Sequence, residues 1–378
     1  MSRTLRVGLN LAYLVEDSGG SGTYARELLP ALLAIEPQLE LTAWIGTTAP
    51  AWLREQDWAR EVRWIRLPVP GTGSPWHLWY ELAGIGVDAR RRRLDLVHGL
   101  AYLAPLVHPG VPMIATILDV IWAHHRDATH RRFRAVMRTL TPLVGRSAVR
   151  IIAISEAARD DISTTLHLDP CKFDVTPLGI RMPAPRDRAD PSATAMRLGL
   201  GPEPVVLCVA AKRAHKNLHG LIRALAQIPE PRPQLVLPGS PNAYEAELRA
   251  LAVELGVAAS VRFPGWVSDP DLEDLYALAR CFVLPTFEEG FGLPVLEAMV
   301  RGVPVACSDI PVLREVAGGA AALFDPGDPA SIAAQIGRLC ADDELSADLV
   351  ARGRERAHQF TWERTARATL ESYRRALE

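Results

Sequence analysis

The sequence lacks several features that would assign it to a specialised class of protein. No hydrophobic stretch reaches the ~18 consecutive apolar residues of a membrane-spanning helix, and the N-terminal residues MSRTLRVGLNLAYL lack the apolar run of a signal peptide. There is no CxxC pair or Cys/His cluster, and the five cysteines are scattered. We therefore expect buried, reduced thiols rather than a disulfide framework or a zinc site, and a cytoplasmic protein.

A strong excess of charge is also missing. The 42 Lys and Arg residues against 44 Asp and Glu residues give a formal net charge of −2. No overall attraction to nucleic acid follows, and contact with anionic lipid would need a local patch. What the chain does have is 48% hydrophobic and 23% charged residues over 378 positions. This composition is typical of a soluble globular protein, and the length favours two domains.

Continuous apolar runs alternate with stretches of helical spacing along the first half. Such runs are typical of strands buried on both faces, so we expect an α/β fold with a doubly wound parallel sheet. The residues VEDSGGSG break the first run, and TYARELLPALLAI behind them has helical spacing. The predicted strands of this half are residues 5–14, 39–46, 94–100, 111–119 and 149–155.

A change of composition divides the chain. Residues 177–202 are rich in Pro, Arg, Asp and Ala with little apolar periodicity, as in a connection between domains. A second series follows, with predicted strands 204–210, 234–239, 261–265 and 281–285 and predicted helices 217–228, 243–256 and 268–280. We expect a Rossmann-like N-terminal domain over 1–185, a linker over 186–201, a Rossmann-like C-terminal domain over 202–358, and a helix over 359–378 that packs back on the N-terminal domain.

The segment LPTFEEGFGLPVLEAMVRGVPV, residues 284–305, carries the most informative chemistry. Glycines bracket Phe291 and Pro294 favours a helix start, so unpaired amides of the first turn would bind a phosphate. Glu297 lies one turn into that helix, where a carboxylate suits paired hydroxyls such as a ribose diol. Glu289 precedes the turn and would face a group farther out. The alternative is a loop feeding a helix, with one acid as cap and the other as surface charge.

The second half resembles the C-terminal domain of retaining glycosyltransferases of family GT4. The likeness follows FPGWVSDPDLEDLYALARCFVLPTFEEGFGLPVLEAMVRGVPVACSDIPVLREVAGGAAALFDPGDP almost position by position. It also covers GGSGTYARELL, ISEAARDDI, AKRAHKN and FTWERTARATLESYRRAL, so it spans nearly the whole chain. The resemblance implies the GT-B fold, with two Rossmann-like domains facing a central cleft, and transfer of a sugar from a nucleotide-sugar donor with retention of anomeric configuration.

The resemblance also implies roles for individual residues. Glu289 would contact the donor sugar, Glu297 the ribose and Lys216 the diphosphate. The mechanism favoured for the family is front-face displacement, in which the leaving phosphate helps deprotonate the acceptor and cations stabilise its charge. We predict Glu289, Lys216 and Asp119 as catalytic residues and expect no metal or other cofactor. The predicted donor-binding residues are Gly20, Ser21, Gly22, Arg213, Lys216, Glu289, Gly290, Phe291, Gly292, Leu293, Val295 and Glu297.

The chain lacks one positively charged residue that the family pattern contains. The family's partner arginine would stand near Ala210, where this chain has none, and Lys212 or Arg213 could substitute for it. In the first half, the glycine-rich residues 20–22 let backbone approach a ligand next to a helix N-terminus. They do not form a GxGxxG dinucleotide fingerprint, and a plain tight turn is the alternative.

A second departure concerns a histidine. Family members commonly carry one where Leu118 stands, and leucine cannot donate a hydrogen bond. Either Asp119, His124 or His125 takes over, or activity differs. His98 lies at the end of a predicted strand, where it would touch the acceptor side unless it is a structural histidine.

Two further groups are ambiguous. Trp76, with Trp79 and Tyr80, could stack on acceptor sugar rings or pack in the core. The basic runs 89–95 and 130–138 fit solvated helix faces, but the second could touch a membrane carrying a lipid-linked acceptor. The DPD sequence at 269–271 imitates a metal motif and is expected to cap a helix instead.

The expected function is therefore glycosyl transfer. GDP-mannose is the first donor expected, followed by UDP- or TDP-sugars, and the acceptor would be a glycan, a lipid-linked sugar or a small molecule. Two alternatives remain: a nucleotide-sugar-binding protein without turnover, suggested by Leu118 and the missing arginine, and a GT-B-fold sugar epimerase.

Overall fold

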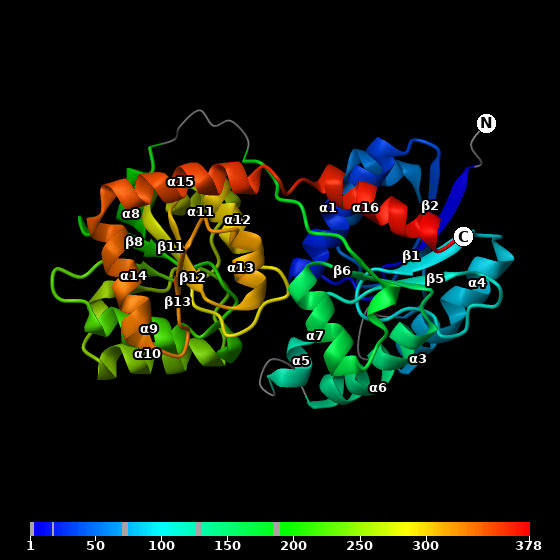
Figure 1. Ribbon diagram of the computed structural model, residues 1–378, viewed down its shortest axis with the longest axis horizontal. Coiled ribbons are helices and arrows are strands. Elements are labelled where there is room, and N and C mark those ends of the chain that lie inside the picture. Colours follow the sequence, from blue (N-terminus) through cyan, green and yellow to red (C-terminus); the bar gives the residue numbers. More distant parts are fainter. Residues whose placement is uncertain (1–3, 17–18, 70–74, 126–130, 184–189) are drawn as a thin grey trace. The chain divides into compact units, whose positions relative to one another are not determined.

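The computed structural model describes residues 4–16, 19–69, 75–125, 131–183 and 190–378. The chain divides into two compact α/β units, each built on its own parallel sheet (Figure 1). The first unit comprises Met1–His124, Thr129–Gly179 and Thr361–Glu378, and the second comprises His125–Ala128 and Ile180–Phe360.

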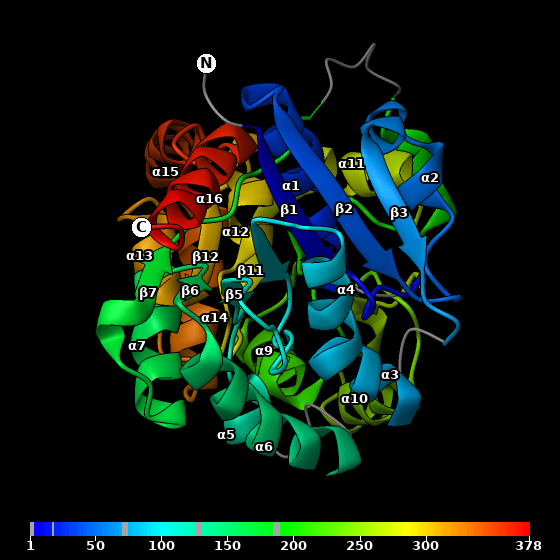
Figure 2. The ribbon, with the colours of Figure 1, turned by 90° about the vertical axis from the view of Figure 1, so that its right-hand side faces the viewer.

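The first unit has a seven-stranded sheet in the order β3-β2-β1-β4-β5-β6-β7 (Figure 2). The order reverses between β1 and β4, so the segments after these neighbouring strands emerge at one edge, where ligands of doubly wound sheets bind. The strands are β1 (Leu5–Asn10), β2 (Leu39–Ile45), β3 (Val62–Arg66), β4 (Leu96–Gly99), β5 (Met113–Thr116), β6 (Arg150–Ala153) and β7 (Phe173–Val175).

Helices of this unit connect the parallel strands. They are α1 (Gly19–Ile35), α2 (Trp52–Glu55), α3 (Pro75–Trp79), α4 (Ile85–Arg91), α5 (Ile121–His124), α6 (Arg131–Ser147), α7 (Glu156–Leu166) and α16 (Trp362–Arg375). A π-helical turn (Tyr80–Gly84) and 3-10 turns (Asp57–Glu61 and Pro170–Lys172) complete the set within the described residues.

The C-terminal helix α16 packs on α1 in the first unit (Figure 2). Its N-terminus is capped by Thr361, whose hydroxyl accepts from the backbone of Arg364. Asp174 then ties the other end to β7, because its carboxylate accepts hydrogen bonds from Ser372 and Arg375, each at 2.7 Å. Burial opposes ionisation of Asp174, but hydrogen bonds from Arg150 and Ser372 outweigh it and lower the pKa of this carboxyl.

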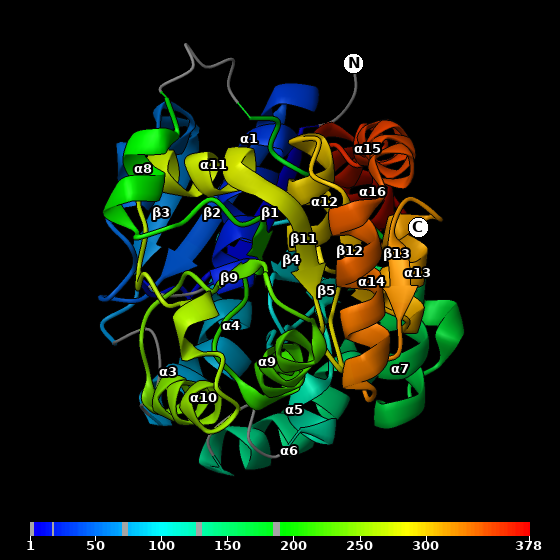
Figure 3. The ribbon, with the colours of Figure 1, turned by 90° about the vertical axis from the view of Figure 1, so that its left-hand side faces the viewer.

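The second unit has a six-stranded sheet in the order β10-β9-β8-β11-β12-β13 (Figure 3). Its strands are β8 (Val205–Leu207), β9 (Gln234–Val236), β10 (Val261–Arg262), β11 (Ala279–Leu284), β12 (Val305–Ser308) and β13 (Ala322–Phe324). Its helices are α8 (Ser192–Arg197), α9 (Leu218–Gln227), α10 (Ala243–Glu254), α11 (Asp269–Leu278), α12 (Leu293–Val300), α13 (Pro311–Ala317), α14 (Pro329–Ala341) and α15 (Asp343–Ala357), with 3-10 turns at Ala214–Lys216 and Ala258–Ser260.

A single apolar cluster fills one side of this second sheet. Alternate strand residues, such as Val206 on β8 and Cys281 and Val283 on β11, pack there with side chains from α9, α10 and α14. This spacing follows from the pleat of a strand, which sends every second side chain to the same face. The sheet order again reverses between its first strand β8 and β11.

The predicted linker is wrong for residues 190–201. Ser192–Arg197 form α8, which packs on α11 in the second unit, and Thr194 donates a 2.8 Å hydrogen bond to Asp274. The compositional change marks a loop-rich entry to the unit rather than a free connection, and residues 184–189 lie outside the described residues. The short strands β3, β7, β12 and β13 were not predicted from the sequence.

Candidate functional site

Two loops meet at the carboxyl edge of the second sheet. One follows β8 and ends in the 3-10 turn Ala214–Lys216, and the other follows β11 and leads into α12. Because β8 and β11 are neighbours at the reversal of strand order, the loops lie side by side. The two predicted motifs are far apart in the sequence, and the fold brings them together.

Lys216 and Glu289 form the central ion pair of this site. Lys216 Nζ lies 2.6 Å from Glu289 Oε1, and the two side chains are only 15% and 10% exposed. At this distance and burial the pair is a strong charge-assisted hydrogen bond. The predicted cation and the predicted sugar-facing carboxylate therefore neutralise each other in the ligand-free protein.

Backbone and amide contacts fix the geometry of the pair. The carbonyl of His215 accepts the Thr286 hydroxyl at 3.0 Å and the Phe287 N–H at 2.8 Å. Asn217 adopts a left-handed φ of 54° and caps α9 through Oδ1. Its amide group donates to the carbonyls of Pro285 at 3.1 Å and Pro326 at 2.7 Å. The loops that carry Lys216 and Glu289 are therefore one hydrogen-bonded unit.

The glycine-rich turn between the two acids starts α12 as predicted. Gly292 precedes the helix with φ of 99°, and a proline occupies its first turn. The prediction for Val295 as an amide donor is wrong, because its N–H already donates to the Gly292 carbonyl at 3.0 Å. Phe291 is buried against Phe360, with ring centroids 5.8 Å apart, so only its backbone can face a ligand. Gly290 and Leu293 keep their predicted place in this turn.

Glu297 lies partly buried on α12 beside an aromatic and cationic pair. The hydroxyl of Tyr276 donates to Glu297 Oε2 at 3.4 Å, and the Arg301 guanidinium stacks 4.7 Å from the Tyr276 ring centroid. Desolvation raises the pKa of Glu297, while Arg301 partly opposes this shift. A desolvated carboxylate with a weak hydrogen bond is suited to receive hydroxyl donors from a ligand.

This environment predicts a pH-dependent effect of Glu297→Gln on stability. A carboxyl whose pKa is higher in the folded state binds more protons folded than unfolded, so its contribution to stability falls as pH rises. We expect the variant to match the wild type near pH 4, about the unfolded pKa of glutamate, and to be more stable at pH ~7.5. Urea unfolding at both pH values measures the free energy of unfolding, and Glu254→Gln on the exposed face of α10 is the control. Equal stability gains of Glu297→Gln at both pH values would contradict the raised pKa of Glu297.

The two cations expected to replace the missing arginine differ in their surroundings. Lys212 is buried, and its ammonium lies 3.1 Å from Glu245 Oε2 and donates to the Gly239 carbonyl. Lys212 is therefore held within the unit, and that alternative is wrong. Arg213 is exposed in the same loop and keeps its predicted role.

In the first unit, the glycine-rich motif is part of a helix rather than a loop. Gly20, Ser21 and Gly22 occupy the first turn of α1, which follows β1 at the point of strand-order reversal. Amides in a first helical turn lack intrahelical acceptors, so the motif stays a predicted anion site. The Ser21 carbonyl accepts a 3.2 Å hydrogen bond from Tyr13, which anchors the turn.

Asp119 and Leu118 follow β5 in the first unit. Tyr102 donates a 2.7 Å hydrogen bond to Asp119 Oδ2, and Oδ1 accepts the Ile121 backbone at the start of α5. Tyr102 itself has a φ of 59°, a conformation that non-glycine residues adopt mostly where surrounding structure enforces it. Asp119 is thus held in a fixed orientation, while Leu118 is 7% exposed and offers only apolar surface.

His98 is a structural histidine. It is fully buried, with Nδ1 2.9 Å from the Tyr373 hydroxyl and Nε2 2.8 Å from Thr116 Oγ1. Burial lowers its pKa to about 3, so it stays neutral. Both ring nitrogens are engaged inside the unit, and the acceptor-side prediction for His98 is wrong.

Comparison with known proteins assigns the family. A model described as Glycosyltransferase Family 4 matches residues 18–182, and one described as Glycosyl transferases group 1 matches residues 197–356. A D-inositol 3-phosphate glycosyltransferase of Jonesia denitrificans is 30% identical over an alignment of 393 residues, which covers 95% of this chain and 92% of that protein. The chain belongs to glycosyltransferase family 4.

Two further similarities bear on this glycosyltransferase. The O-antigen chain mannosyltransferase B of Escherichia coli is 35% identical over 233 residues, which are 60% of this chain and 61% of that protein, less than two thirds of its length. The solved structure of a sucrose-phosphate synthase from Thermosynechococcus elongatus is similar with a TM-score of 0.76 and 24% identity over 98% of each chain. This likeness and the two parallel sheets establish the GT-B fold.

Other predicted residues of the glycosyltransferase are exposed or half-buried. His124 Nε2 is 3.1 Å from Asp161 Oδ1, and His125 Nε2, grouped with the second unit, is 2.9 Å from Glu288 Oε2. Trp76 on α3 is 67% exposed, which rules out the core-packing alternative and leaves its predicted role as a stacking surface. The DPD sequence forms the first turn of α11 rather than its cap, which is Ser268, whose hydroxyl accepts the backbone N–H of Asp271.

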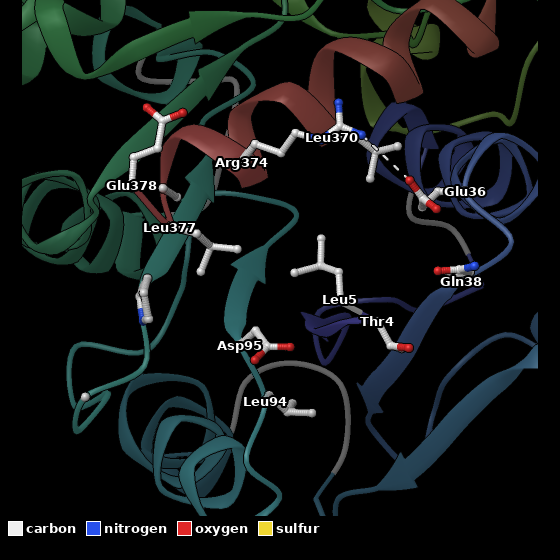
Figure 4. A pocket seen from close by; sticks show the side chains of 13 residues that line it. Thr4, Leu5, Glu36, Gln38, Leu94, Asp95, Leu370, Arg374, Leu377 and Glu378 are labelled. Carbon is white, nitrogen blue, oxygen red and sulfur yellow. Dashed lines mark ion pairs between the residues drawn. The ribbon is translucent and has the colours of Figure 1, made fainter. Parts of the chain in front are cut away.

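A pocket of about 570 Å³ in the first unit is not part of the predicted site (Figure 4). It is lined by Thr4 and Leu5 at the beginning of β1 and by Asp95 just before β4. These are the amino ends of the strands, whereas the glycine-rich turn of α1 lies beyond the carboxyl end of β1. Arg374 of α16 and Glu36 form an ion pair across it at 3.7 Å.

Proposed function

We propose that this glycosyltransferase transfers mannose from GDP-mannose, with retention of the anomeric configuration, to a glycan, a lipid-linked sugar or a small molecule. The Lys216–Glu289 pair carries the proposal, because it places a partly buried cation and a carboxylate next to the start of α12. A diphosphate needs the cation and the helix amides, and sugar hydroxyls need the carboxylate. The name of the Escherichia coli relative supports mannose as the sugar.

Different residues of the site bind different parts of the donor. Lys216 and the amides around Leu293 bind the diphosphate, Glu289 accepts hydrogen bonds from the sugar, and Glu297 accepts them from the ribose. As the sugar–phosphate bond breaks, charge grows on the leaving phosphate, and Lys216 stabilises it. That phosphate then takes the proton from the attacking acceptor hydroxyl, so no protein base and no metal are required in the proposed step.

Ligand-induced stabilisation tests the donor. A nucleotide at 100 times its dissociation constant stabilises a protein by ~2.7 kcal/mol, so matched concentrations of GDP, UDP, TDP and their sugars can be ranked by Tm. We expect GDP and GDP-mannose to give the largest increase. A larger increase with UDP or TDP would reject the guanine nucleotide, and an inverted product anomer, determined by NMR, would reject retention.

A nucleotide-sugar-binding protein without turnover is the second candidate. Leu118 supports it, because this buried leucine supplies no hydrogen-bond donor where relatives are expected to have one. Donor turnover separates the two candidates. Equal background rates for the wild type and Glu289→Ala, with nucleotide binding retained, would favour the binder; a clear loss in the variant favours transfer. Product analysis without acceptor would reveal an epimerase.

We also propose that helix α6 contacts anionic lipid at the inner face of a membrane. No helix within the described ranges has the length and apolar composition to cross a bilayer. The predicted segment 130–138 falls on α6, apart from residue 130, which lies outside the described residues. Arg131, Arg132 and Arg138 are exposed there, and Phe133 is 44% exposed among them. Exposed cations around an aromatic side chain suit an anionic bilayer surface.

Charge reversal tests the membrane contact. We expect the protein to sediment with phosphatidylglycerol vesicles and Arg131→Glu/Arg132→Glu to lose most of this binding, because each basic residue contributes about 1 kcal/mol near such a surface. Arg90→Glu/Arg91→Glu on α4, in the other basic run, is the matched control and should bind like the wild type. Equal losses in both pairs would indicate a general charge effect and contradict a site on α6.

A further inference from the structure

Two cysteines of the second unit belong to packed elements, β11 and α14, although they are 59 positions apart in the sequence (340 minus 281). Cys281 is fully buried on β11, and Cys340, on the last turn of α14, packs against the same apolar cluster and is partly exposed. Next to the pair, Arg280 on β11 forms an ion pair at 2.6 Å with Asp343, three positions after Cys340. A hydrogen bond between the two thiols accounts for the opposite shifts of their pKa values. A buried thiol thus faces a partly exposed one.

The environment of the pair favours a thiolate on Cys340. The hydrogen bond from Cys281 lowers the pKa of Cys340, although desolvation opposes this, and the Arg280 guanidinium adds to the lowering. The same hydrogen bond and burial raise the pKa of Cys281 well above its usual value. Arg280 Nε is buried and has no hydrogen-bond partner among the described residues. One sulfur is therefore prepared to react, and its neighbour holds a proton.

We propose that Cys340 and Cys281 form a peroxide-sensitive site that closes to a reversible disulfide. The Cys340 thiolate attacks one oxygen of hydrogen peroxide, so an S–O bond forms, the O–O bond breaks, and hydroxide leaves and takes up a proton as water. The Cys281 sulfur then attacks the Cys340 sulfur. The S–S bond forms, the S–O bond breaks, and the hydroxide leaves as a second water with the Cys281 proton. The two thiols lose two electrons and two protons to the peroxide.

The other cysteines of the chain lack this arrangement. Burial raises the pKa of Cys208 and of Cys307 to about 12, and no cysteine contributes to either shift. Cys171 is exposed on the 3-10 turn Pro170–Lys172 of the first unit. None of these cysteines belongs to the proposed donor site, so oxidation of the pair is expected whichever sugar the donor carries.

The site can be tested on the full-length reduced protein treated with stoichiometric hydrogen peroxide. After alkylation without reduction, we expect mass spectrometry to find the peptides of Cys281 and Cys340 joined and the free thiols reduced from five to three, with thioredoxin-like reductants or dithiothreitol restoring five. The buried Cys208 and Cys307 report on unfolding, because they must stay protected from alkylation under native conditions throughout.

Variants separate the two steps. Cys281→Ser removes the resolving sulfur, so dimedone should trap a sulfenic acid on Cys340 at least tenfold more than in the wild type. Cys340→Ser should leave Cys281 reduced, and Cys171→Ser should oxidise like the wild type. Cys281→Ala serves if the serine variant fails to fold. Oxidation of Cys171 alone, or a disulfide that forms only when Cys208 and Cys307 become alkylated, would overturn the proposal.

Discussion

Replacing Lys216 by alanine is expected to lower kcat/KM for sugar transfer by at least ~30-fold, or about 2 kcal/mol of transition-state stabilisation. The reason is that Lys216 is a partly buried cation at the carboxyl edge of the second sheet, held 2.6 Å from Glu289. Charge grows on the leaving phosphate during transfer, and a charge-assisted hydrogen bond strengthens as it grows. Steady-state rates with a saturating acceptor and varied donor provide the measurement.

Controls distinguish this role from general loss of charge. Arg223→Ala removes an exposed cation from α9 and should leave kcat/KM unchanged. Lys216→Arg keeps the charge but not the compact ammonium geometry, so it should recover part of the loss. A Lys216→Ala enzyme with unchanged kcat/KM and an unchanged fold would exclude Lys216 from phosphate binding.

Glu289, the carboxylate partner of Lys216, provides a second test of the proposed roles of this ion pair. In the ligand-free state Glu289 neutralises Lys216, so an incoming diphosphate has to compete with this carboxylate. Glu289→Gln removes the competitor while keeping the shape of the side chain. We expect it to bind the free nucleoside diphosphate as well as the wild type or more tightly, and to lose transfer. Parallel losses of nucleotide binding and transfer would contradict the proposed division of roles.

Substituting Asn217 by alanine is expected to lower the free energy of unfolding by about 3 kcal/mol. The change removes the cap of α9, worth ~1 kcal/mol, and leaves the carbonyls of Pro285 and Pro326 without their donor, at ~1 kcal/mol each. Asp342→Ala removes only the cap of α15, and should cost about 1 kcal/mol. Urea unfolding of the three proteins gives the comparison.

Asn217→Asp adds a test of function. Aspartate keeps an oxygen for the α9 cap and tolerates left-handed backbone, but it cannot donate to either carbonyl. If Asn217 positions the Lys216 and Glu289 loops, this variant should lose more of kcat than its loss of stability would account for, with KM for the acceptor unchanged. If the aspartate variant has the kcat of the wild type, Asn217 acts only as a helix cap and does not position the two loops.

The sequence supported the fold well, because the evidence for it is local. Continuous apolar runs predicted parallel strands, and Ser268, Thr361 and Pro294 marked helix starts that the structure contains. Short strands such as β7 were missed, since three residues carry too little pattern. The linker prediction failed for a related reason: composition reveals a loop-rich stretch but not that Thr194 has a partner eighty positions away.

The candidate site was predictable in its members but not in their partners. The motifs identified Lys216 and Glu289, yet nothing in the sequence indicates that the two form an ion pair. His98 stands at a strand end, as a ligand-contacting histidine would, but Tyr373 and Thr116 engage both its nitrogens. Lys212 and Lys216 are both lysines of one loop, but Lys212 is paired with Glu245 of α10, a contact that the sequence does not reveal. Such choices depend on long-range packing that no local pattern records.

The return of α16 to the first unit makes the second unit an insertion within the first. Its two ends meet, because the Ile180 N–H donates to the Phe360 carbonyl at 3.0 Å, and Gly179 lies so close to Trp362 that a Cβ there would be 2.3 Å from its backbone nitrogen. A segment whose ends adjoin can be excised or exchanged without stretching its host. We therefore expect that residues 180–360, which carry the proposed donor site, can be exchanged between relatives as one piece and rejoined to the first unit at the two adjoining crossings, 179–180 and 360–361.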